Sequence, residues 1–173
     1  MKKTALQFTS GFTLIELLIV IALLGALAIG LLATVDPLEQ LKKGRDTAVR
    51  NTVSELYNSF IRFNAGKAHF PWGVTQINAE TMNAAAETGY IQSVIDLGEL
   101  KKNFLDIAKP NLGRIILSST DKGTGSYMED ITVCFQPESK SFRADDNAMY
   151  NNAGISQADC PKGTNAACHW CVK

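Results

Sequence analysis

Gly11-Phe12-Thr13-Leu14-Ile15-Glu16 opens the stretch that decides the fold, and residues 12–35 read FTLIELLIVIALLGALAIGLLATV. This stretch holds a single charge, on Glu16, and it is uncharged and mostly apolar from Leu17 onward. A helix rises ~1.5 Å per residue, so roughly 20 such residues cross the hydrocarbon core of a bilayer. The stretch therefore predicts one transmembrane helix near the N-terminus.

The segment before this helix, MKKTALQFTSG, is short, polar and basic. Lys2 and Lys3 favour the cytoplasmic side of a membrane, which would place the rest of the chain outside. Two simpler interpretations stay open at this point: an uncleaved anchor, and an ordinary secretory signal cut near Ala26-Leu27-Ala28. A lipoprotein is excluded, because it would need a cysteine near the N-terminus and the first one is Cys134.

Glu16 distinguishes this helix from an ordinary anchor. A carboxylate inside a membrane helix is costly, and it indicates a function and calls for a partner. No Lys, Arg or His lies between Lys3 and Lys42, so a local ion pair is excluded. Cleavage before Phe12 would create a free amine, and we expect Glu16 to pair with such an amine, above all that of a neighbouring subunit.

Gly11 through Glu16, followed by an unbroken apolar helix, resembles the class III signal peptide of type IV pilins and type II secretion pseudopilins. The resemblance implies that a prepilin peptidase cuts after Gly11 and methylates the new N-terminal Phe12. It implies that Glu16 docks each subunit onto the growing filament. The chain would then be a structural subunit with no catalysis and no cofactor of its own.

The same resemblance implies the partners and the location. The partners are identical or related pilin subunits, the peptidase, the lipid bilayer before assembly, and a membrane assembly platform with an ATPase. The precursor would cross the cytoplasmic membrane once with its N-terminus in the cytoplasm. Assembly would then move it to a cell-surface filament or a periplasmic pseudopilus.

Three segments follow from this interpretation. Residues 1–11 form a cleaved leader, residues 12–35 a transmembrane and filament-core helix, and residues 36–173 an amphipathic helix with a globular head. The formal charge of zero becomes −2 without the leader's two lysines (15 basic against 17 acidic), which gives no basic footprint for nucleic acid. Nucleic acid is a partner only if the filament takes up DNA, and the sequence does not separate that role from secretion, motility or adhesion.

Beyond Pro37 the chain predicts an α+β head. The long helix is expected to run to about Asn64, with a break between Gly25 and Pro37 and a stop at Ala65-Gly66. One face of this helix is expected to be buried, and it carries Leu41, Ala48, Val49, Thr52, Leu56, Phe60 and Phe63. The opposite face is expected to be solvated, and it carries Lys42, Lys43, Asp46, Arg50 and Glu55. Short helices are expected at 79–88, capped by Asn78, and at about 93–104. Strands at 114–118, 130–135 and 140–144 would form a small antiparallel sheet against the long helix.

Four cysteines lie in the last 40 residues: Cys134, Cys160, Cys168 and Cys171. Their even number beyond a membrane segment predicts two disulfides that fix the irregular tail to the sheet. Three pairings are open. Cys168-His169-Trp170-Cys171 also suits a secreted or anchored thiol-disulfide protein, although no helix follows the motif. The four cysteines could also bind zinc, although the chain has only one CxxC.

The stretch from 145 to 152 is rich in side-chain oxygen. Asp145, Asp146 and Asn151 are the calcium candidates, by likeness to the late calcium loop of major pseudopilins. The spacing matches no EF-hand loop, so a plain polar loop is the preferred interpretation.

Overall fold

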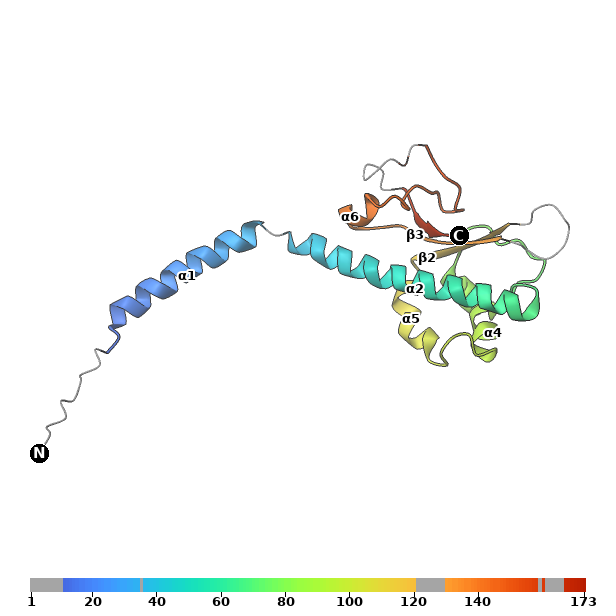
Figure 1. Cartoon of the computed structure of the whole chain (residues 1–173), viewed down its shortest axis with the longest axis horizontal. Helices are drawn as coiled ribbons and strands as arrows, with labels where there is room; N and C mark the ends of the chain where they lie inside the picture. The colour runs from blue at the N-terminus through green and yellow to red at the C-terminus, as the bar shows by residue number, and fades with distance from the viewer. Residues whose placement is uncertain (1–10, 35, 121–129, 159, 161–166) are drawn as a thin grey trace, which may run out of the picture. The chain divides into compact units, whose positions relative to one another are not determined.

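The computed structural model describes residues 11–34, 36–120, 130–158, 160 and 167–173. The chain divides into two compact units, residues 1–37 and residues 38–173. The elements are α1 (Leu14–Thr34), α2 (Pro37–Lys67), β1 (Glu80–Thr81), α3 (Met82–Glu87), α4 (Tyr90–Asp96), α5 (Phe104–Leu112), β2 (Ile115–Thr120), β3 (Asp130–Phe135), α6 (Lys140–Arg143) and β4 (Trp170–Val172) (Figure 1).

The predicted break in the long helix falls between α1 and α2. α1 ends at Thr34 and α2 begins with Pro37. Proline suits the first helical position, because its missing N–H would have no partner there and its φ is already helical. The second helix ends three residues later than Asn64, since Lys67 is still helical and Ala68 takes the left-handed turn with φ 59°.

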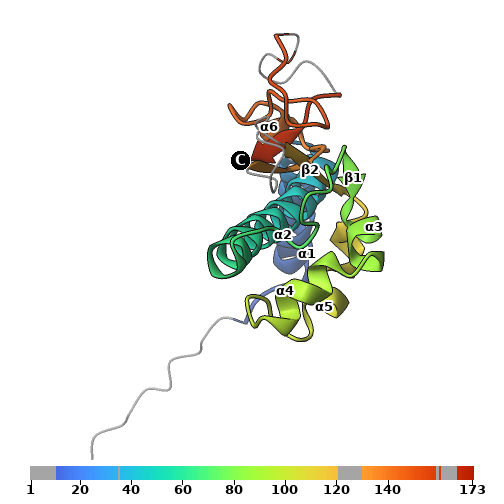
Figure 2. The same ribbon diagram turned by 90° about the vertical axis from the view of Figure 1, so that its right-hand side faces the viewer.

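In the head, α2 lies between the sheet on one side and α4 and α5 on the other (Figures 1 and 2). Val49, Val53, Leu56 and Phe60 recur every three or four residues and are fully buried. They meet buried side chains of both layers: Ile115, Leu117, Val133 and Phe135 from the sheet, with Ile91, Val94, Phe104 and Ala108 from the helices. The helical period of the apolar residues is thus what gives the head one core.

The sheet has the order β1-β2-β3-β4 and is antiparallel throughout. The long pair runs from Ile115 opposite Phe135 to Thr120 opposite Asp130, which confirms two of the three predicted strands. Neither β1 nor β4, which have two and three residues, was predicted from the sequence. Strands this short carry too little alternation to be recognised.

The third predicted strand, 140–144, is wrong. Residues Lys140–Arg143 form α6, whose N-cap Ser139 accepts a hydrogen bond from the N–H of Phe142. Phe142 is buried against Phe135, with ring centroids 6.2 Å apart. A tertiary contact therefore overrides the alternating polar and apolar pattern that suggested a strand.

Two short helices also differ from the prediction. The first begins at Met82 with Thr81 as its N-cap, not Asn78, because residues 80–81 pair with β2. The predicted helix at 93–104 is wrong in its bounds: α4 begins at Tyr90 and ends at Asp96. Phe104 instead starts α5, which was not predicted and which contains Pro110 near its end.

Candidate functional site

The start of α1 is built around a reciprocal pair of residues, Thr13 and Glu16. The Glu16 carboxylate accepts hydrogen bonds from the Thr13 backbone N–H at 2.8 Å and from the Thr13 hydroxyl at 2.6 Å. The N–H of Glu16 donates back to the Thr13 hydroxyl at 3.3 Å. This is a capping box, in which a threonine and a glutamate three residues later satisfy two otherwise unpaired backbone donors.

The capping box corrects one expectation about Glu16. A charged partner within the chain was excluded, but a neutral local partner, Thr13, was overlooked. The Thr-x-x-Glu spacing in the sequence could have revealed it. Hydrogen bonds from Thr13 orient the carboxylate without neutralising it, so its charge still lacks a cation among the described residues.

The remainder of α1 exposes apolar side chains on all faces. Leu14, Ile15 and Leu32 are 81%, 66% and 73% exposed. Residues Leu14–Leu32 are long and apolar enough to cross a membrane. An apolar surface this continuous marks a membrane or protein contact. The helix is therefore consistent with membrane anchoring, and Gly11 and Phe12 lie exposed immediately before it.

The cysteines form two disulfides, Cys134–Cys171 and Cys160–Cys168. The first joins residues directly opposite each other in β3 and β4, and so fixes the end of the chain to the sheet. Cys168 and Cys171 are not bonded to each other, which removes the CxxC disulfide that the thiol-enzyme interpretation needs. Since all four sulfurs are used in bridges, the zinc interpretation loses its thiolate ligands as well.

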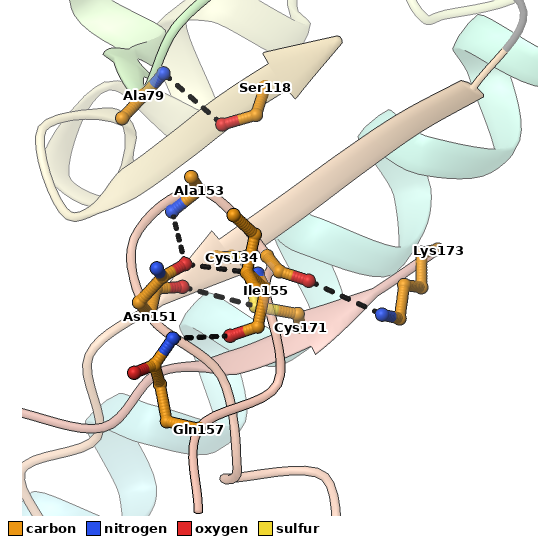
Figure 3. Close-up of a disulfide and its surroundings, with 10 residues drawn as sticks. Ala79, Ser118, Cys134, Asn151, Ala153, Ile155, Gln157, Cys171 and Lys173 are labelled. Atoms are coloured by element: carbon orange, nitrogen blue, oxygen red, sulfur yellow. Dashed lines mark hydrogen bonds between the residues drawn. A yellow bond between two sulfur atoms is a disulfide. The ribbon is translucent and has the colours of Figure 1, made fainter. Parts of the chain in front are cut away.

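The oxygen-rich loop holds itself together with the side chains that were calcium candidates. Asn151 Oδ1 accepts the N–H groups of Ala153 at 3.0 Å and Ile155 at 2.9 Å, beside the Cys134–Cys171 bridge (Figure 3). Asp145 Oδ1 accepts the N–H of Asn147 at 2.9 Å and the indole N–H of Trp170 at 3.3 Å. These contacts make Asp145 and Asn151 loop supports, and among the described residues no group of three His, Cys, Asp or Glu side chains could hold a metal. A calcium role for Asp145, Asp146 and Asn151 stays a prediction.

A carboxylate clamp, defined here as Glu39 and Asp46 of α2, holds the backbone amides at the N-terminal end of α6. Asp46 Oδ2 accepts the N–H of Ser139 at 2.7 Å and of Glu138 at 3.0 Å. Glu39 accepts the next amide, that of Lys140. The two acidic residues are seven apart, two helical turns, so one face of α2 presents both.

Asp46 corrects the assignment of its helix face to solvent. Its side chain is fully buried, and Arg114 donates to Oδ1 at 2.9 Å. Burial by itself would raise the pKa of Asp46, but the hydrogen bonds from Ser139, Glu138 and Arg114 outweigh burial and lower it. Conversely, Leu41 and Ala48 of the predicted inner face are exposed. The charge on Asp46 looked like a surface charge because its partners lie 68 to 93 residues away.

Residues 8–32 match the family model of the prokaryotic N-terminal methylation motif. This motif is the class III signal peptide of type IV pilins and pseudopilins, and the match spans the capping box and most of α1. No curated protein matches the chain, and no solved structure does. The motif supports a type IV pilin-like or pseudopilin precursor, a class of structural subunits and not of enzymes.

Proposed function

We propose that the chain is a filament subunit that is cut after Gly11, methylated on Phe12, and assembled through α1. The single observation that carries this proposal is the charged capping box at the start of an otherwise wholly apolar, exposed helix within the methylation motif. Lys2 and Lys3 orient the precursor, and the membrane stores it until an ATPase-driven platform extracts it.

Assembly buries the exposed apolar surface of α1 when the helix leaves the lipid. Packing α1 against copies of itself keeps its apolar side chains buried once it leaves the lipid, where exposure to water would cost ~25 cal/mol for each Å². Glu16 enters that apolar bundle with its carboxylate held by Thr13. A methylated N-terminal amine of a neighbouring subunit supplies the missing positive charge.

The first test is mass spectrometry of the chain isolated from its native membrane. The expected N-terminal peptide starts at Phe12 and carries one extra methyl group. A chain that starts at Ile29 would indicate an ordinary secreted domain, and an intact Met1 a simple anchor. Either result would overturn the proposal.

A pair of variants separates the charge of Glu16 from its capping role. Glu16→Gln keeps a side-chain acceptor for the Thr13 N–H and loses the charge, whereas Thr13→Val loses the two hydrogen bonds of the Thr13 hydroxyl and keeps the charge. We expect both variants to be processed normally. Filament incorporation should fail for Glu16→Gln and persist for Thr13→Val; normal filaments from Glu16→Gln would refute the charge-pairing role.

A further inference from the structure

The two disulfides are nested along the chain. Cys134 pairs with the last cysteine, Cys171, and the inner two, Cys160 and Cys168, pair with each other. The bonded residues are 37 and 8 positions apart. Export delivers the chain in sequence order, so Cys134 always meets Cys160 and Cys168 before its native partner.

A local competitor, the bond Cys168–Cys171, forms more readily than the outer bridge in an unfolded chain. The probability of closing a loop falls with about the 3/2 power of its length. For separations of 3 and 37 this favours the local pair by roughly 40-fold on loop length alone. Only two residues separate Cys168 from Cys171, so this pair forms the shortest possible disulfide loop in a chain that is oxidised before it folds.

The folded head excludes that local bond. Trp170–Val172 is the extended strand β4, and His169 forms a bridge with Tyr150 immediately before it. An extended chain rises ~3.3 Å per residue, so three residues separate Cα atoms by about 10 Å. A disulfide tolerates a Cα separation of no more than about 7 Å.

The native bridges close only as the core forms. Cys134, Cys168 and Cys171 are all buried, with 0%, 6% and 5% exposed. Cys134 and Cys171 become neighbours only when β4 pairs with β3. A chain carrying the local bond therefore cannot complete the sheet, and the wrong bond must be opened first.

We infer that the head is a substrate of a thiol–disulfide isomerase, which attacks Cys171 Sγ of a Cys168–Cys171 bond. This inference rests on the proposed function only in placing the head where cysteines are oxidised. The enzyme thiolate forms a mixed disulfide with Cys171 and releases Cys168 as a thiolate. The Cys134 thiolate then attacks Cys171 Sγ, forms the native outer bridge and releases the enzyme thiolate.

The exchange moves no net electrons, because one protein disulfide replaces another. The inner bridge needs an oxidation: Cys160 and Cys168 pass two electrons and two protons to the disulfide of a dithiol oxidase. The reaction sequence thus uses two partners of different chemistry, an oxidase for each new bond and an isomerase for the misplaced one.

The test uses the full chain in detergent, reduced in urea and reoxidised by a dithiol oxidase, with or without protein disulfide isomerase. Free thiols are alkylated at intervals and the bridges mapped. Trypsin cuts after Lys162 and chymotrypsin after Trp170, so Cys160, Cys168 and Cys171 fall on separate peptides, and those of Cys168 and Cys171 stay joined only when these two cysteines are bonded to each other. We expect that joined pair to accumulate first, and the isomerase to accelerate its conversion to the native pairs at least tenfold.

A matched control removes the competitor. The double variant Cys160→Ser/Cys168→Ser keeps only the outer pair, so it should form Cys134–Cys171 equally fast with and without the isomerase. A wild-type chain that reaches both native bridges without the local bond, or at the same rate without the isomerase, would overturn the inference. Because the assay measures no filament, its failure would leave the N-terminal mass test of the proposed function unaffected.

Discussion

Replacing Asp46 tests whether the carboxylate clamp holds residues 138–140 onto α2. Asp46→Ala removes the acceptor for two backbone amides and one guanidinium and leaves the amides of Glu138 and Ser139 without it. Breaking a buried ion pair by removing one partner costs about 3–5 kcal/mol of unfolding free energy. We expect Asp46→Asn, which keeps one oxygen acceptor but no charge, to lose about half as much.

Urea unfolding of the full chain in detergent measures this loss. The two tryptophans, Trp72 and Trp170, are buried in the head and report its unfolding by fluorescence. Glu55→Ala is the matched control, since it removes an exposed carboxylate from the same helix. An unfolding free energy for Asp46→Ala that stays within about 0.5 kcal/mol of the value for this control would refute the reasoning, because surface substitutions have effects of that size.

The pH dependence of the same transition gives a second check. The pKa of Asp46 is lowered in the folded head, so the unfolded chain takes up a proton first as the pH falls. The stabilisation is therefore complete above the ordinary aspartate value, about 4, and is lost as the pH drops below it. Asp46→Asn should flatten that part of the curve.

Three further outcomes are expected. Burial lowers the pKa of His169, partly opposed by a hydrogen bond to the Ala167 backbone, so the stability of the head should fall as the pH drops below about 6.5. His169→Gln should abolish that loss in thermal melts. Gly154→Ala should cost about 1–3 kcal/mol more than Gly98→Ala in urea unfolding, because both have positive φ but only at Gly154 would the new Cβ lie 2.3 Å from Thr132 Cγ2; equal losses would contradict the clash. Cys134→Ser/Cys171→Ser should lower stability by about 4 kcal/mol and Cys160→Ser/Cys168→Ser by about 2.5 kcal/mol, from their loop lengths, and a reversed order in calorimetry would argue against the loop-entropy account.

Periodicity made the long elements predictable. The α+β class and the strands β2 and β3 follow from patterns that extend over five or more residues, and the break follows from Pro37, which cannot continue a helix. Tertiary contacts decided the rest: α6 is helical because Phe142 packs on Phe135 and its preceding amides meet Asp46. No local pattern reports partners that lie so far away in sequence.

The functional segment shows the same division. The motif from Gly11 to Glu16 was recognisable because its chemistry is contiguous, although the Thr13 cap was overlooked. The disulfide pairing was open, because three connectivities fit the same four positions and only the register of β3 with β4 selects one. The processing roles of Gly11 and Phe12 and the assembly role of Glu16 remain predictions.

The Cys134–Cys171 bridge also sets how the head responds to a pulling force. A subunit under tension can lengthen only by unravelling chain that lies between the points of attachment. The residues between the two cysteines form a closed covalent ring, so they contribute no length however far the core opens. At ~3.5 Å per extended residue, a separation of 37 positions withholds about 130 Å of extension. Under the proposed function, the tail beyond β3 therefore adds no length to a subunit that is pulled within a filament.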